Sequence, residues 1–533
     1  KIPDYTAALS LDGPLFRLKG APVTFFSALN LRKQAYTLPH PRDSRDAGNG
    51  MFNIAWNPKN IKMKLTGFYN TDAHSTLQEN GDFANQAKYY RGWGSLLNTD
   101  TWLLNYGFTQ FLNERLFYEL KLATYWSHFK EKPSDFSLVG ASQKPTLWGF
   151  YRFDGYESEP FDNYSPVLYN DILTGDLSLT GNVNWQFDAN NLLKSGFELR
   201  YNTYDERETY RIPSFSRDKS LWLNRGLMER YHPLQAALFL QDKMEFESMI
   251  LNVGVRYDYY DPNINWFEPT TLYNLAIDPA FDPALDPDKD QVDANGHVKY
   301  AFDNVLDKAR KPAKAWHMIS PRFGVSFPIS DNSLLHFNYG HYYQMPPLDQ
   351  SFEIGYFRPE YIVKNILAER TAAAAEGREE RHIPSNDGDA ERVVGFTNQP
   401  LKPQKTIQFE AGFKQSFEGI AVLDLVAYYK DVFDQTQERI GLFDHHIYGW
   451  DPFSGVTTPN ASYQTYLTGD YGDSRGIEAA LHSLFSKVLF FDVNYSFSRA
   501  TEGRATPGVI RYDGEGNIDY TWDSDVNKRI PIE

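Results

Sequence analysis

Apolar and polar residues alternate strictly along residues 249–260, MILNVGVRYDYY. Every second position from Met249 to Tyr259 is aliphatic or aromatic, and the positions between them include Gly254, Arg256 and Asp258. Successive side chains of an extended chain point to opposite faces, so this period of two predicts a β-strand with one apolar face and one polar face.

The same alternation recurs along the whole chain and predicts about sixteen strands, with almost no amphipathic helix between them. The clearest examples are SGFELRYNTY (195–204), LLHFNYGHYY (334–343), TIQFEAGFK (406–414) and FFDVNYSFSR (490–499). Similar segments occupy residues near 22–32, 49–57, 61–71, 100–111, 115–128, 176–187, 233–246, 317–329, 420–432 and 472–484.

The connections between these strands fall into two classes that alternate along the chain. Short connections are expected at 57–60, 112–115, 188–191, 246–248, 330–332, 417–419 and 485–487. Long ones are expected at about 33–48, 129–174, 206–231, 262–315, 344–401 and 433–471. In an antiparallel up-and-down arrangement this order places all tight turns at one end and all long loops at the other, as in transmembrane β-barrels with short periplasmic turns and long extracellular loops.

The apolar faces could point inward, as in a soluble β-sandwich, or outward to lipid. Three features favour lipid. About sixteen strands exceed the roughly eight whose barrel interior side chains can fill. The strands are longer than the average soluble strand of about 5–6 residues. Aromatic residues make up 16% of the chain, and such residues concentrate at membrane interfaces. The sequence therefore predicts an all-β transmembrane barrel with a polar interior.

Charge and cysteine content narrow the function further. The net charge of −16 argues against a nucleic-acid partner, because phosphate binding requires a basic surface. Cysteine is absent, which fits export through an oxidising envelope without requiring it. No nucleophile elbow, HExxH motif or phosphate-binding loop occurs, so we expect no enzyme activity.

Five segments in order resemble TonB-dependent outer-membrane receptors of the kind found in Bacteroidota-like bacteria. They are residues 10–18 (SLDGPLFRL, resembling an early Gly-Pro turn), 231–263, 320–348, 401–417 and 471–481. The resemblance implies a 22-stranded barrel in the bacterial outer membrane, surrounded by lipid and lipopolysaccharide. It also implies an N-terminal plug, contact with TonB through the plug region, and surface lipoproteins or other outer-membrane subunits as partners.

About sixteen strands are fewer than that family has, so residues 1–533 are expected to be a barrel that is incomplete at both ends. Loop parity predicts a first strand that runs downward, preceded by a plug and an upward strand before Lys1. Five or six further strands are expected after Glu533.

Candidate binding residues lie in the long loops. Asp286, Asp288 and Asp290, with Asp293 nearby, have the spacing of Ca²⁺ ligands, but Gln291 and His297 replace the Gly and Glu of a calcium hand, so a solvated acidic loop is the alternative. No other cofactor is expected. Candidate ligand-stacking or metal-binding side chains are Tyr342, Tyr343, Tyr356, Phe357, His445, His446 and Trp450. Residues 361–382, with their alanine run, predict a helical insert in an extracellular loop.

Two functions remain open from the sequence. The first is a receptor that captures a scarce nutrient through its extracellular loops and imports it with TonB-coupled energy. The second is a structural or assembly barrel in an outer-membrane complex, in which import is weakened or lost. A plain diffusion porin is a third possibility, and no residue identifies the substrate.

Overall fold

The computed structural model describes residues 4–37, 40–77, 94–133, 168–212, 221–226, 230–267, 291–292, 298–299, 310–352, 354–356, 372–378, 401–417, 420–442, 462–484, 490–505, 509–510 and 529–532. Sixteen long strands dominate these ranges. They are β1 (Tyr5–Leu18), β2 (Ala21–Ala35), β3 (Ser44–Trp56), β4 (Ile61–Leu77), β5 (Gly94–Asn113), β6 (Leu116–Pro133), β7 (Leu168–Gln186), β8 (Asn191–Ile212), β10 (Leu234–Glu245), β11 (Ile250–Asp261), β16 (Trp316–Ser330), β17 (Ser333–Gln344), β19 (Gln404–Phe417), β20 (Ala421–Leu442), β21 (Ser462–Leu484) and β22 (Phe490–Gly503).

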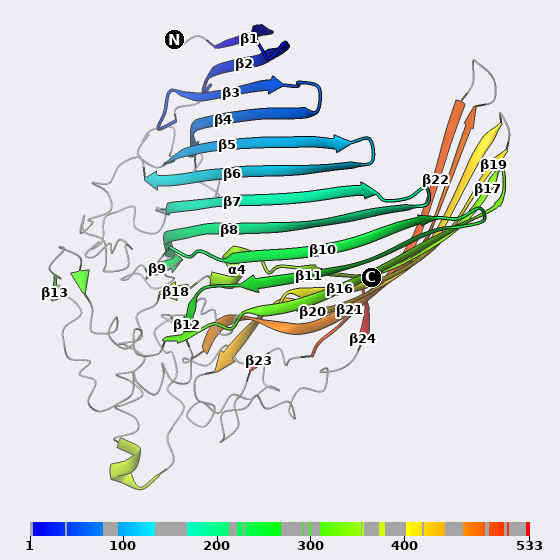
Figure 1. The fold of residues 1–533 in the computed structure, drawn as a ribbon. Helices are drawn as coiled ribbons and strands as arrows, with labels where there is room; N and C mark the ends of the chain where they lie inside the picture. The colour runs from blue at the N-terminus through cyan, green and yellow to red at the C-terminus, as the bar shows by residue number, and fades with distance from the viewer. Residues whose placement is uncertain are drawn as a thin grey trace.

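Each long strand pairs antiparallel with the next long strand along the chain, from β1 to β22. Figure 1 shows the resulting sheet, which curves strongly so that β16 to β22 sweep round from the plane of β3 to β10. The predicted up-and-down antiparallel topology is confirmed.

Short elements extend this sheet or lie at its long-loop end. They are β9 (Leu221–Gly226), β12 (Asn265–Phe267), β13 (Gln291–Val292), β14 (Val298–Lys299), β15 (Arg310–Pro312), the helix α4 (Leu348–Phe352), β18 (Ile354–Tyr356), β23 (Val509–Ile510) and β24 (Arg529–Ile532). Within the segment 361–382, residues 372–376 form a helical turn. The other residues of that segment except 377–378 lie outside the described part, so the longer helix stays a prediction.

The tight connections gather at one end of the sheet, as the alternation of short and long connections predicts (Figure 1). One further hairpin turn joins β1 to β2 at Lys19 and Gly20, where both residues have positive φ, 49° and 83°. Two consecutive residues of this kind match the twist of paired strands, and glycine takes the second position without strain.

The prediction of a Gly-Pro turn within residues 10–18 is wrong. Gly13 and Pro14 lie inside β1, and the pairing with β2 shifts register between Pro14 and Phe16. Proline lacks the amide hydrogen that a regular ladder uses, so within strands it is confined to edges, first residues and bulges. The sequence signal for a turn here marks a bulge instead.

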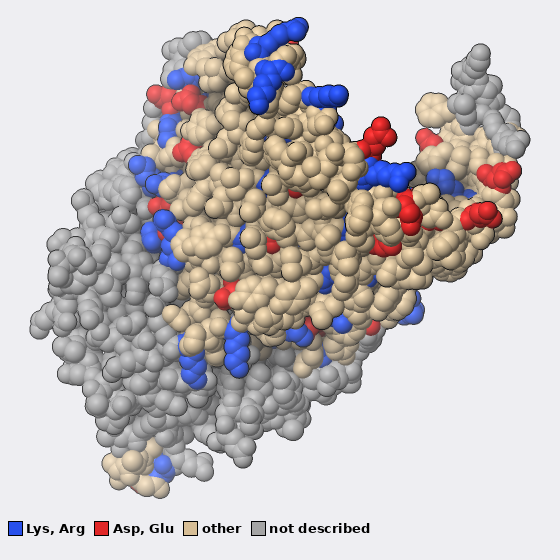
Figure 2. Space-filling model, in the orientation of Figure 1, with Lys and Arg blue, Asp and Glu red and all other residues tan. Residues whose placement is uncertain are grey.

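The apolar face of the sheet is exposed, not packed in a core. Val255 is 47% exposed, Phe409 50% and Phe497 58%. Conversely, charged residues such as Asp258, Arg439 and Asp470 are buried. Figure 2 shows few charged side chains over the middle of the strands in this view and more toward the margins. This distribution confirms the prediction that the apolar side chains face outward and are not packed in a core.

Aromatic side chains line the tight-turn end of the apolar face. Trp185 near the end of β7 and Phe187 just beyond it are exposed and have ring centroids 5.7 Å apart. Phe246, Phe417 and Phe490 occupy the corresponding ends of other hairpins and are also exposed. Such rings favour the boundary between hydrocarbon and water, where aromatic belts form.

A small buried cluster holds the long-loop end together. Tyr204, Tyr231 and Ile264 are its buried members, and Ile172, Ala313 and Leu348 pack against them. Leu348 is the first residue of α4, so this contact seats the short helix against the ends of the strands. In the described part of the chain, no helix is both long and apolar enough to cross a membrane.

The turn between β7 and β8 yields a prediction on pH. Asp188 accepts hydrogen bonds from the backbone N–H groups of Asn190 and Asn191, both at 2.8 Å, and from the Asn191 side-chain amide. The bond from the Asn190 N–H, followed by those from Asn191, lowers the pKa of Asp188 from its usual value of 3.8. The stabilisation that this carboxylate gives to the folded turn is therefore complete above a pH of 3.8 and is lost as the pH falls through the lower folded-state pKa.

We expect the protection of the Asn190 and Asn191 amide hydrogens, measured against an unstructured peptide at the same pH, to fall as the pH drops below about 4. In Asp188→Ala this protection should be low at neutral pH as well, while Asp331→Ala, in another turn, should leave it unchanged. Equal protection in Asp188→Ala and the native protein would contradict the role of this carboxylate.

Candidate ligand-binding wall on the polar face

Strand register places residues from four strands side by side, and three of these strands contribute polar side chains. Glu198 of β8 faces Ala237 of β10, which faces Asp258 of β11. The adjacent row of the same face carries Arg256 of β11 opposite Ser320 of β16. Because directly opposed residues of an antiparallel pair share one face, these rows form a continuous polar wall.

Two arginines and two carboxylates stabilise this wall. The Nε of Arg256 donates to Oδ1 of Asp258 at 2.8 Å, and its Nη2 donates to Oε2 of Glu198 at 3.2 Å. The Nη2 of Arg200 donates to the other oxygen, Oε1, of Glu198 at 3.1 Å. Carboxylates of the wall therefore neutralise the charge of both arginines.

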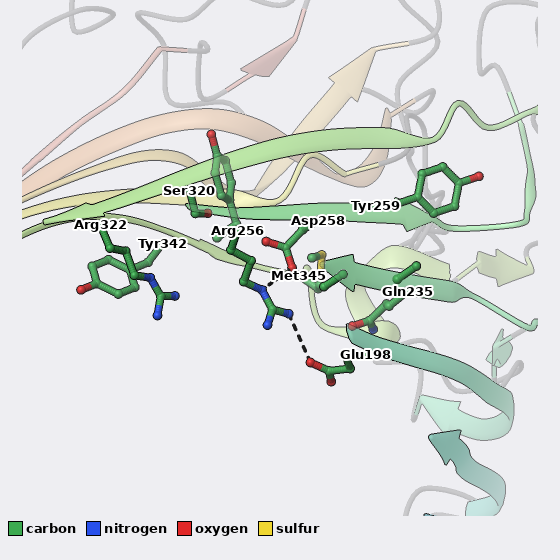
Figure 3. Close-up of a pocket in the computed structure, with 12 residues that line it drawn as sticks. Glu198, Gln235, Arg256, Asp258, Tyr259, Ser320, Arg322, Tyr342 and Met345 are labelled. Carbon is green, nitrogen blue, oxygen red and sulfur yellow. Dashed lines mark hydrogen bonds and ion pairs between the residues drawn. The ribbon is translucent and has the colours of Figure 1, made fainter. Parts of the chain in front are cut away.

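Next to this network lies a cavity of about 250 Å³. Figure 3 shows the lining side chains Glu198, Arg256, Asp258, Ser320, Arg322 and Tyr342, which come from β8, β11, β16 and β17. Pockets that bind small molecules combine apolar surface with a few convergent polar groups. This cavity has such groups from strands far apart in the sequence.

Arg322 is held differently from Arg256. Its guanidinium carbon lies 4.9 Å from the ring centroid of Tyr342, which is a cation–π contact. Gly340, directly opposite Arg322 in the sheet, makes this possible, because a Cβ there would lie 2.8 Å from the Tyr342 hydroxyl oxygen. The absence of a side chain lets the ring lie along the wall beside Arg322.

Asp258 and Glu198 share Arg256 but differ in exposure, which gives a paired prediction. Asp258 is buried, so Asp258→Ala leaves Nε of Arg256 without its partner and should cost about 1–3 kcal/mol of unfolding free energy. The Glu198 side chain is 30% exposed, so Glu198→Ala should cost less than about 1 kcal/mol. Denaturant unfolding of both variants in detergent or lipid measures the difference. A larger loss for Glu198→Ala would contradict this view of the network.

Of the loop residues expected to bind ligand, the structure places Tyr342 in the cavity wall with 40% of its surface exposed. Tyr343 is half-buried and also lines the cavity, although its neighbour in the sheet is Lys405 on the opposite face. Both are strand residues of β17 instead of loop residues. Tyr356 lies in β18, paired with Asn224 of β9.

The remaining candidates stay predictions. Phe357, His445, His446 and Trp450 lie outside the described residues, as do the proposed calcium ligands Asp286, Asp288, Asp290 and Asp293. Elsewhere in the described ranges, no group of three or more His, Asp or Glu residues could hold a metal ion. A calcium site in the 282–296 loop stays a prediction.

The wall residues Glu198, Arg256 and Arg322 were not singled out as a site from the sequence. Alternation assigns Glu198 and Arg256 to the polar face, but Glu198 and Arg256 are separated by 58 positions along the chain. Only the register between β8, β10 and β11 reveals that they meet. Alternation offers only the assignment of each residue to the polar face, which many charged residues share, so the sequence holds no signal that singles out this pair.

An apolar exterior, a polar wall and tight turns at one end define a transmembrane β-barrel protein. The family model described as TonB dependent receptor-like, beta-barrel matches residues 35–531. The chain belongs to this family and is an integral protein of the bacterial outer membrane, and its polar face lines the lumen. No curated protein sequence matches it significantly.

Solved structures agree with this fold. The ferric yersiniabactin uptake receptor FyuA from Yersinia pestis matches with a TM-score of 0.52 and 9% identity over 93% of this chain and 59% of its own. The FrpB iron transporter from Neisseria meningitidis has a TM-score of 0.51 and 10% identity, covering 95% of this chain and 62% of its own. The chain thus spans about six tenths of the length of these structures.

Proposed function

We propose that the protein is a receptor that binds a scarce nutrient at its long loops and lumen wall and imports it with energy delivered through TonB. The observation that carries this proposal is the family match over residues 35–531. Two of the similar solved structures are a ferric yersiniabactin uptake receptor and an iron transporter.

The lumen wall would contribute binding and no covalent chemistry. Its charged groups are fixed before the solute arrives, because Arg256 and Arg200 are bonded to Asp258 and Glu198. Preformed polar groups lose little conformational entropy on binding, which favours specific recognition. Movement of the solute past this wall would depend on work done through TonB and the proton gradient of the inner membrane.

Uptake by cells tests this function. The full-length protein would be expressed in a host whose own receptors for candidate nutrients are deleted, with and without TonB. Accumulation of a labelled nutrient should require the protein, TonB and the proton gradient, so an uncoupler should abolish it. Uptake without TonB would indicate a diffusion porin, and no uptake with stable co-purifying outer-membrane subunits would indicate an assembly barrel.

A further inference from the structure

Two cations occupy one transverse row of the lumen wall. Arg322 of β16 faces Gly340 of β17, Gly340 faces Gln408 of β19, and Gln408 faces Lys430 of β20. Three steps between neighbouring strands separate Arg322 from Lys430, and at about 4.8 Å a step this gives roughly 14 Å. Both side chains belong to the same face, because the row passes only through directly opposed residues.

The two cations are supported by the same local design. Each lies over a tyrosine ring, Arg322 at 4.9 Å from the centroid of Tyr342 and Lys430 at 5.1 Å from that of Tyr428. Each ring in turn lies over a glycine. A Cβ on Gly340 would meet the Tyr342 ring, and a Cβ on Gly476 would lie 2.8 Å from Cζ of Tyr428.

Within the described residues, neither Arg322 nor Lys430 forms an ion pair, and each cation contacts a tyrosine ring. The nearby carboxylate on the lumen face, Glu410, already accepts from Asn338 at 2.9 Å and from Gln408 at 3.3 Å. Ring contacts hold a cation in place but leave its N–H donors free. The row therefore presents two positioned cations whose N–H donors bond to no acceptor among the described residues.

The Tyr342 ring, which covers Gly340, and the side chain of Gln408, whose amide donates to Glu410, form the surface between the two cations. The cavity of about 250 Å³ opens beside Arg322, so there is room for part of a small solute. Planar guanidinium and compact ammonium groups both favour carboxylate and phosphate oxygens, with charge-assisted bonds stronger than neutral ones.

We propose that Arg322 and Lys430 form a two-point site for a solute that carries two acidic groups, carboxylate or phosphate, whose separation is of the same order as the backbone spacing of the two residues, about 14 Å. This inference rests on the proposed function and specifies its substrate class as a diacid. Arg322 engages one acidic group beside the cavity, and Lys430 engages the other across Gly340 and Gln408.

Graded probes test the site on the purified full-length protein in detergent. The probes are oligo(ethylene glycol) chains of increasing length that end in two carboxylates, in two phosphates or in two hydroxyls, and calorimetry measures their affinity. We expect diacid affinity to peak at the length that spans about 14 Å and the neutral diols not to bind. Comparison of the carboxylate and phosphate series identifies which acid the site prefers.

Arg322→Gln and Lys430→Gln should each weaken binding of the best diacid roughly tenfold or more, because each removes one charge-assisted contact. Lys62→Gln is the matched control, since Lys62 lies 5.1 Å from the Phe111 ring centroid on the distant strand β4 and should leave affinity unchanged. Thermal unfolding of all three variants verifies that they are folded.

Binding that is independent of probe length, or equal in the diols, overturns the proposal. So does equal weakening by Lys62→Gln, or absence of diacid binding because an acidic segment of the protein itself fills the site. Uptake assays keep this separate from transport: TonB-dependent import that persists in Arg322→Gln/Lys430→Gln rejects the diacid site alone. Diacid binding without energy-dependent import rejects the importer alone.

Discussion

Leu179→Arg should cost about 2–4 kcal/mol of unfolding free energy in lipid, whereas Thr180→Arg, one residue later in β7, should cost less than about 1 kcal/mol. Leu179 belongs to the apolar face and is exposed, with Leu122 of β6 and Leu199 of β8 as its neighbours. It lies well inside the aromatic row that ends at Trp185, so an arginine there must leave water for hydrocarbon. Thr180 belongs to the lumen face, opposite Lys121 and Glu198, where an arginine stays hydrated and lies beside a carboxylate.

Reversible unfolding from lipid vesicles by denaturant measures both variants, and the yield of folded protein in the outer membrane gives a second readout. The two substitutions add the same side chain to adjacent positions of one strand. The effects of strand propensity and local crowding therefore largely cancel when the two losses of unfolding free energy are compared. A greater loss for Thr180→Arg would mean that the apolar face does not meet lipid.

Gly476→Ala should destabilise the protein by about 1–3 kcal/mol, the usual cost of overpacking. A Cβ at this position would lie 2.5 Å from the backbone oxygen of Phe497 and 2.8 Å from the Tyr428 ring. The backbone oxygen belongs to the neighbouring strand β22 and cannot move without disturbing the ladder. The ring of Tyr428 would also leave its position under Lys430.

Gly107→Ala is the matched control, because Gly107 is also in a membrane strand but a Cβ there has its nearest neighbour, the Lys64 backbone oxygen, at 4.0 Å. Replacing glycine where space and φ allow it reduces the entropy of the unfolded chain, so this variant should be neutral or stabilised by up to about 1 kcal/mol. Denaturant midpoints of the two variants decide the matter. Similar destabilisation by both would show that glycine is required by the strands in general and not by the close contact.

The alternation of apolar and polar residues was sufficient to predict the strands, their order and the outward apolar face. It succeeds because each membrane strand has lipid on one side and water on the other, so every hairpin repeats the same signal. The strand β1 illustrates the limit. A proline in a strand and a proline in a turn give the same sequence signal, and only the pairing with β2 places Pro14 beside a bulge.

The site could not be predicted in the same way. Tyr342 was selected for its aromatic ring, whereas its partner Arg322 lies on β16 and the glycine that accommodates its ring, Gly340, lies two residues before it. Whether a cation can bind a solute depends on whether neighbouring side chains already pair with it. Those neighbours are set by the register across several strands. Alternation identifies the face on which a residue lies, but it does not identify the residue opposite it on the neighbouring strand.

The pairing of each long strand with its successor in the chain separates the evolution of the loops from that of the wall. Adjacent strand ends lie only about 5 Å apart, so a connection of any length starts and finishes at nearly the same place. Doubling the length of a flexible connection adds only about 0.6 kcal/mol of closure entropy. The long connections can therefore be exchanged for others that form a new binding surface, by recombination or by grafting, while the hairpins that carry them remain unaltered.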